Sequence, residues 1–134
     1  MIDDLSQAVR AQRERATEVG SMPADVLLYR AAPNAWNALE ILEHLCISSG
    51  IYLRGLERVF DERAAALPAN PVFTPGRLGE YFTRSMQPRP DGSIPNRMRT
   101  FRKFDPPRNE GASMASIDRF IDQCDRFLVL LEQA

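Results

Sequence analysis

The chain has few residues of the kinds that bind metals or form disulfides. Its 134 residues include two cysteines and one histidine. The sequence contains no paired-cysteine zinc motif and no glycine loop of the kind that cradles phosphate. Cys46 and Cys124 lie in apolar helical patterns, where a cysteine usually acts as a small buried hydrophobe. We therefore expect free thiols, and any metal or imidazole chemistry rests on His44.

The chain also lacks long apolar runs. No stretch approaches the 18 uninterrupted apolar residues that a membrane-spanning helix needs. The N-terminal residues MIDDLSQAVRAQRER are charged and include no apolar signal region. With 44% hydrophobic and 26% charged residues, the composition is typical of a globular protein. We expect one cytoplasmic domain over residues 1–134, with no membrane partner.

The net charge of −1 is unevenly distributed. Residues 76–108 hold eight basic and three acidic residues. This segment therefore has a net charge of +5, and the rest of the chain has a net charge of −6. Such a segment can form a surface for anions or nucleic acid, or can be a solvated loop with structural ion pairs. Phe101 and Phe104 could stack on single-stranded nucleic acid. No recognised nucleic-acid fold accompanies them, so we expect no nucleic-acid partner.

Apolar residues recurring at steps of three and four predict an all-α fold. We expect a first helix over Ile2–Val19, a long helix over Ala38–Arg63, a short one near Gly76–Met86 and a last one beginning at Ser113 or Ser116. The segment 66–112 holds eight of the ten prolines. A connection of this length lets the helices on either side of it lie parallel.

The long helix contains the most informative residues. Asn37 is its predicted N-cap, with Glu40 placed to return a hydrogen bond to the Asn37 amide. We expect residues 24–35 to connect the first helix to the long helix, with Trp36 anchoring this connection against the first turn of the long helix. The expected core stripe consists of Leu39, Leu42, Leu45, Cys46, Tyr52, Leu53, Leu56, Val59 and Phe60.

The opening of this helix, in the stretch YRAAPNAWNALEILEHL, resembles the DinB-like (YfiT-like) helical bundle superfamily, whose second helix opens with a tryptophan, an N-cap and a His-Leu pair. The later stretch RMRTFRKFDPP is similar to the crossover of these proteins. The resemblance covers almost the whole chain. It implies an up-down-down-up four-helix bundle with a long crossover between its second and third helices.

The resemblance also implies a divalent metal, commonly nickel or zinc, and activity as a metal-dependent hydrolase or a transferase of low-molecular-weight thiols. His44 matches the metal ligand of the second helix. The family's other two ligands lie one turn apart on the fourth helix, and no residue here matches them. The sequence shows three long helical patterns where the family has four, so we expect a C-terminally incomplete domain that does not bind the metal tightly by itself.

The residues themselves leave other readings open. Glu40 lies one turn before His44, and a third ligand would have to come from Asp118, Asp122 or Asp125 on the polar side of the last helix. The simpler interpretation of His44 is a histidine on the flank of the core stripe, hydrogen-bonded to a neighbour.

A rival function is a non-catalytic interaction or oligomerisation module. Three amphipathic helices without a fourth should expose a long apolar groove, which a second copy would fill to give a homodimer. A third interpretation is a coding sequence that was cut short, which translation beyond Ala134 would test.

Overall fold

The computed structural model describes residues 2–63, 66, 74, 76–93, 100–106 and 112–134. Within these residues the regular secondary structure is entirely helical, which confirms the all-α class. The four-helix DinB-like arrangement stays a prediction. The elements are α1 (Ile2–Gly20), α2 (Ala24–Leu28), α3 (Ala38–Arg63), α4 (Arg77–Met86), the 3₁₀ helix η2 (Arg102–Phe104) and α5 (Met114–Gln133).

The chain divides into two compact units. The first combines Met1–Ala64 with Arg102–Ala134 and holds α1, α2, α3, η2 and α5. The second, Ala65–Phe101, holds α4. In α4, Arg84 donates to Glu80 across one turn at 2.6 Å. The apolar side chains of α4, Leu78, Tyr81 and Phe82, are more than half exposed.

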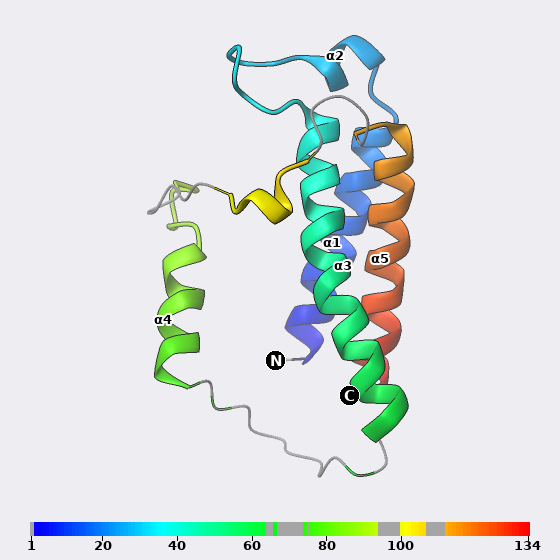
Figure 1. Ribbon diagram of the computed structural model, residues 1–134, viewed down its shortest axis with the longest axis vertical. Helices are drawn as coiled ribbons and strands as arrows, with labels where there is room; N and C mark the ends of the chain where they lie inside the picture. The colour runs from blue at the N-terminus through cyan, green and yellow to red at the C-terminus, as the bar shows by residue number, and fades with distance from the viewer. Residues whose placement is uncertain (1, 64–65, 67–73, 75, 94–99, 107–111) are drawn as a thin grey trace. The chain divides into compact units, whose positions relative to one another are not determined.

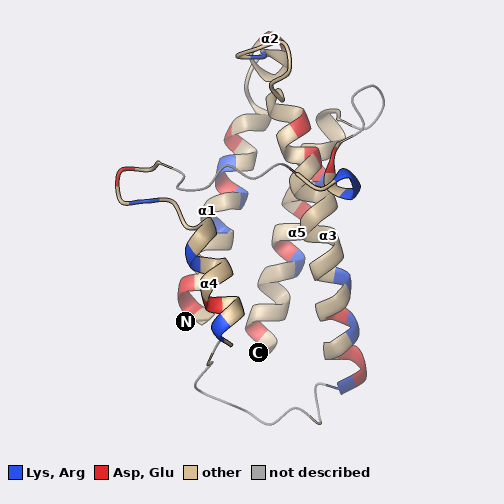
Figure 2. Cartoon of the chain, turned by 60° about the vertical axis from the view of Figure 1, so that its left-hand side comes forward, with Lys and Arg blue, Asp and Glu red and all other residues tan. Residues whose placement is uncertain are grey.

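The helix α5 lies between α1 and α3 in the first unit (Figure 2). It packs along both α1 and α3, whereas no extensive α1–α3 contact is found in the described part of the chain. Figure 1 shows α3 and α5 running in the same direction, with α1 antiparallel to both. This parallel pair is the arrangement that the long segment between the two helices permits.

The core of this unit lies along the line where α5 meets its two neighbours. Its buried apolar residues come from α1, α2, α3 and α5: Ala16, Leu27, Leu39, Leu42, Cys46, Ile117, Phe120 and Cys124. These positions recur at the three- and four-residue steps that the sequence pattern predicted. The bounds expected for α1, α3 and α4 agree with those observed to within one residue, and α5 begins at Met114, between the two expected starts.

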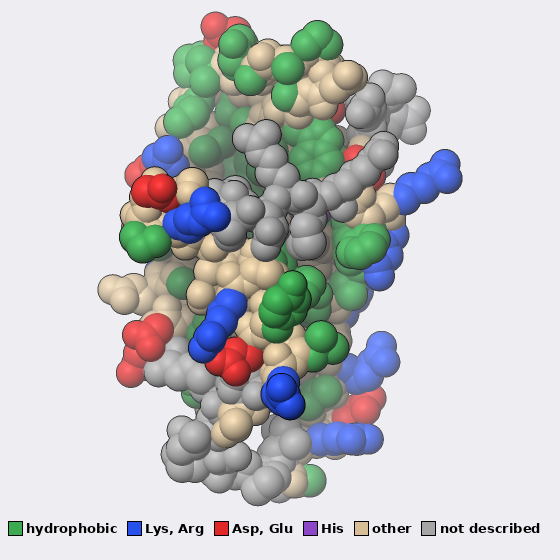
Figure 3. All heavy atoms as spheres, turned by 90° about the vertical axis from the view of Figure 1, so that its left-hand side faces the viewer, with side chains coloured by type: hydrophobic (Ala, Val, Ile, Leu, Met, Phe, Trp, Pro, Cys, Tyr) green, Lys and Arg blue, Asp and Glu red, His purple; other side chains and the backbone are tan. Residues whose placement is uncertain are grey.

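The predicted core stripe of α3 is only partly correct. Leu39, Leu42, Cys46 and Leu53 are buried, but Tyr52 is 66% exposed, and Leu56 and Val59 are also exposed. The apolar stripe of α3 is wider than the contact with α5. Residues of the stripe that lie beyond this contact therefore remain exposed. On the face of the molecule shown in Figure 3, hydrophobic side chains likewise reach the surface among charged ones.

The connection between α1 and α3 contains a short helix that the pattern did not predict. Pro23 precedes α2, and its carbonyl accepts hydrogen bonds from the amides of Val26 and Leu27. Proline suits this N-cap position because a helix makes no use of the amide proton there, so none is lost. The turn places Leu27 in the core with 1% of its surface exposed.

The two cysteines are free and buried, as the sequence predicted. The Cys46 thiol donates to the carbonyl oxygen of Ser116 at 3.2 Å. Burial raises the pKa of the Cys46 thiol from 9.0 to about 11, and burial also raises the pKa of Cys124. Neither thiol is therefore ionised, and hence reactive, near neutral pH.

Alkaline pH should therefore destabilise the protein. Between pH 9 and about 11 the unfolded chain releases the Cys46 proton while the folded chain retains it. The stability present below the unfolded pKa is then lost progressively, by on the order of 2 kcal/mol across this window. Urea unfolding at pH 8 and pH 10.5 measures the loss, which should be smaller in Cys46→Ala. Equal losses in the two proteins would contradict the prediction.

Candidate functional site

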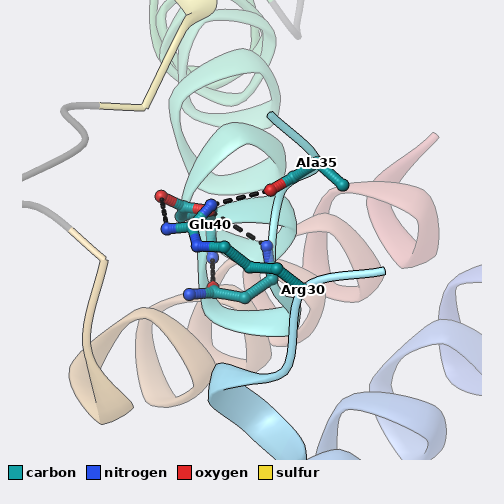
Figure 4. Close-up of polar contacts among 4 residues, drawn as sticks. Arg30, Ala35 and Glu40 are labelled. Carbon is teal, nitrogen blue, oxygen red and sulfur yellow. Dashed lines mark hydrogen bonds and ion pairs between the residues drawn. The ribbon is translucent and has the colours of Figure 1, made fainter. Parts of the chain in front are cut away.

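The entry to α3 carries the reciprocal cap that the sequence predicted. The Asn37 side chain accepts a hydrogen bond from the Glu40 amide at 2.9 Å, and Glu40 accepts one from the Asn37 amide at 3.0 Å. Arg30 adds two charge-assisted bonds to the Glu40 carboxylate, at 2.6 and 2.7 Å (Figure 4). It also donates to the carbonyl of Ala35, so one guanidinium ties the connection to the helix.

The carboxylate in this cap belongs to Glu40, which the sequence offered as a possible metal ligand beside His44. Glu40 is 2% exposed, and both of its carboxylate oxygens bind Arg30. The hydrogen bond to Glu40 raises the pKa of the Arg30 guanidinium. Because metal coordination would have to displace a bidentate ion pair, Glu40 serves the helix start and not a His44-centred ligand set.

His44 lies half-buried on the flank of α3, where the simpler interpretation placed it. Its Nδ1 is 2.8 Å from the carbonyl oxygen of Phe104, the last residue of η2, sixty residues further along the chain. A carbonyl can only accept, so Nδ1 carries the proton and Nε2 of the neutral ring carries the lone pair. The ring of Trp36 lies 5.1 Å from the imidazole, at an interplanar angle of 38°. Together these contacts hold the imidazole in one orientation.

The structure does not bring the other candidate ligands to His44 as a cluster. Asp125 binds Arg13 at 2.6 Å, which lowers the pKa of that carboxyl, and Asp122 lies 3.6 Å from Arg126. Asp118 is exposed. Among the described residues, no group of three or more His, Cys, Asp or Glu side chains is arranged to hold a metal ion.

A buried polar cluster between α3 and α5 was not predicted. The carboxylate of Glu43 accepts hydrogen bonds from the Ser116 hydroxyl and from Arg119, each at 2.7 Å. Ser116 also returns the capping bond to Ser113 at the start of α5. The cap was visible in the sequence, but no sequence signal pairs Glu43 with residues more than seventy positions away. The cluster fixes the register of the two parallel helices.

An apolar cavity of about 360 Å³ opens between α1, α3 and α5. Since α1 and α3 both pack on α5, the surface between them forms a groove with α5 as its floor. We call this surface the open groove, and its lining residues are Leu5, Val9, Gln12, Ser49, Leu56, Phe120, Gln123, Cys124, Phe127 and Leu131. The expectation that three amphipathic helices leave an apolar groove agrees with this arrangement.

One polar side chain in the open groove is incompletely satisfied. Gln123 is 7% exposed, and its Nε2 donates to the carbonyl of Cys46 at 3.1 Å. Its Oε1 is buried and has no hydrogen-bond partner among the described residues. Gly50 makes room for this amide, because a Cβ atom at that position would lie 3.0 Å from Nε2. Leaving a buried acceptor such as Oε1 of Gln123 unpaired is costly.

The basic segment is only partly described. Arg84 is paired within α4, and the Lys103 ammonium lies 4.7 Å from the centre of the Phe104 ring. Arg97, Arg99 and Arg108 fall outside the described residues.

No described helix combines the length and the apolar character needed to cross a bilayer. Comparisons of the chain with family models, curated proteins and solved structures give no match.

Proposed function

We propose that the chain is a DinB-like helical bundle protein related to divalent-metal-dependent hydrolases or low-molecular-weight thiol transferases, in which the metal site is incomplete. His44 is the one prepared ligand. This assignment combines the sequence resemblance at the start of α3 with the surroundings of His44. The described residues supply no second or third ligand, so no catalytic step is assigned to a metal here.

The observation that carries the proposal is the hydrogen bond from Nδ1 of His44 to the Phe104 carbonyl. Histidines that bind metals almost always donate their other ring nitrogen to a carbonyl or carboxylate, which fixes the tautomer and makes the coordinating nitrogen more basic. The bond to Phe104 fixes the tautomer of His44 and makes its Nε2 more basic. The Trp36 ring restricts the orientation of the imidazole further. A neutral imidazole suits nickel or zinc, the two metals that the resemblance implies.

Adding Ni²⁺ should selectively perturb the ring signals of His44 in nuclear magnetic resonance spectra. The single histidine of the chain gives one set of imidazole resonances, so the readout is unambiguous. One ligand gives weak binding, with a dissociation constant above about 100 µM. His44→Ala has no imidazole signal, so calorimetric titration of this variant with Ni²⁺ should show that the binding is lost. Trp36→Phe is the matched control, because it changes the ring neighbour and keeps the imidazole. Unperturbed His44 signals would refute the proposed ligand, and tight one-to-one binding would show that the ligand set is complete.

The second candidate is a non-catalytic interaction module that assembles as a homodimer. The open groove favours it, because a contiguous apolar surface on a globular protein commonly marks an interaction site. Light scattering measures the molar mass directly, and a stable monomer at all concentrations would contradict this candidate.

A further inference from the structure

The turn η2 and the two residues after it lie on α3 at the level of His44. The turn packs on α3, beside which it appears in yellow in Figure 1. We call residues 102–106 the strap. Of these, Phe104 is half-buried and Pro106 is buried, whereas the other three are exposed. The strap is therefore attached along one side only.

The strap has the features of a segment that can open without the rest of the bundle. Its turn is closed by a hydrogen bond from the Asp105 amide to the Arg102 carbonyl, which at 3.3 Å is long for such a bond. Segments with few buried side chains open at a lower free energy than the core. The second compact unit ends at Phe101, so the strap is also the point at which the chain re-enters the first unit.

The contact between the strap and α3 also determines the chemistry of His44. The Phe104 carbonyl accepts a hydrogen bond from Nδ1 at 2.8 Å, so the docked strap requires the proton on Nδ1. With the proton on Nε2 instead, the lone pair of Nδ1 would face those of the carbonyl oxygen. A neutral imidazole in water has no such constraint, because water can donate to or accept from either nitrogen. Docking of the strap and the tautomer of His44 therefore depend on each other.

We infer that the strap is a reversible clasp that prepares His44. When the strap is docked, the lone pair is held on Nε2. When the strap opens, both tautomers are populated and this preparation is lost. The inference deepens the proposed function, on which it rests, because it names what regulates the same imidazole. The coupling is reciprocal, so a factor that favours the Nδ1–H tautomer favours docking by the same free energy.

Native-state hydrogen exchange of the full chain tests whether the strap opens by itself. The Asp105 amide reports on the strap, and the Cys124 amide in α5 reports on the core. His44→Phe keeps a ring beside Trp36 but removes the donor, so exchange at Asp105 should become about 10-fold faster. Leu53→Ala is the matched control, since this core residue of α3 is 1% exposed. It should speed exchange at Cys124 by about 100-fold and at Asp105 by less than about 2-fold.

Two results of this experiment would overturn the inference. Equal acceleration of both amides by Leu53→Ala would show that the strap opens only when the whole bundle unfolds. An unchanged rate at Asp105 in His44→Phe would show that the imidazole does not hold the strap.

Nitrogen-15 magnetic resonance of the single imidazole tests the effect on His44. With the ring neutral, the wild-type chain should show a protonated Nδ1 and a bare Nε2. Phe104→Ala combined with Pro106→Gly removes the attached side of the strap, so the Asp105 amide should lose its protection. Both nitrogen signals should then shift towards the averaged values of a freely exchanging imidazole. Arg102→Ala is the control, because it changes an exposed strap residue and keeps the backbone turn, so neither reading should change.

The outcomes separate the strap from the proposed ligand. A protected Asp105 amide in the double variant, or an unchanged Nδ1–H tautomer, overturns the inference. Neither reading uses a metal. A failure of Ni²⁺ to perturb the wild-type His44 signals therefore refutes the proposed ligand alone.

Discussion

Replacing Glu40 by glutamine should destabilise the protein by on the order of 3 kcal/mol, because the change removes a buried charge from a bidentate ion pair. The carboxylate is 2% exposed and accepts bonds from Arg30 and from the Asn37 amide. Glutamine keeps one acceptor oxygen for the helix cap, but its amide group cannot accept the second bond from the guanidinium. The midpoint of urea unfolding measures the effect.

Glu57→Gln is the control for this prediction. Glu57 also forms a two-bond ion pair, with Arg126 at 2.8 and 2.7 Å, yet its side chain is 29% exposed whereas Glu40 is 2% exposed. Water screens such pairs and they contribute little, so the control should lose less than about 1 kcal/mol. Equal losses in the two variants would show that burial of Glu40 does not strengthen its contribution.

Leu27→Ala should cost about 3 kcal/mol, although the residue lies in a helix of only five residues. Its side chain is 1% exposed and belongs to the core cluster with Ala16 and Leu39. Truncation removes apolar contacts and leaves a cavity at the end of the bundle. Leu28→Ala provides an adjacent control, because Leu28 is 56% exposed and should change stability by less than about 0.5 kcal/mol. Thermal unfolding of both variants compares the two positions directly.

Local signals in the sequence predicted the helices well. The start of α3 follows from the pairing of Asn37 with Glu40, which requires only four consecutive residues. The beginning of α5 is likewise marked by Ser113 and Ser116. These caps are readable because the atoms that form them are neighbours in the chain.

Contacts between distant residues could not be predicted in the same way. The partner of Glu40 is Arg30, and the His44 imidazole binds a backbone carbonyl sixty residues away, which has no side-chain signature. The apolar pattern of α3 likewise gave no means of separating Leu53, which is buried, from Tyr52, which is not. That difference depends on which side of α3 meets α5, and a periodic pattern contains no information about the width of that contact.

The central position of α5 also sets the order in which the bundle can assemble. A ribosome releases α1 and α3 before it synthesises α5, yet both early helices pack mainly on the late one. Short isolated helices are marginally stable in water, so neither has a lasting partner until the late helix emerges. Native contacts such as Glu43 with Arg119 span 76 residues, and closing so long a loop slows folding. The nascent chain should therefore remain sensitive to proteases until α5 has left the ribosome tunnel.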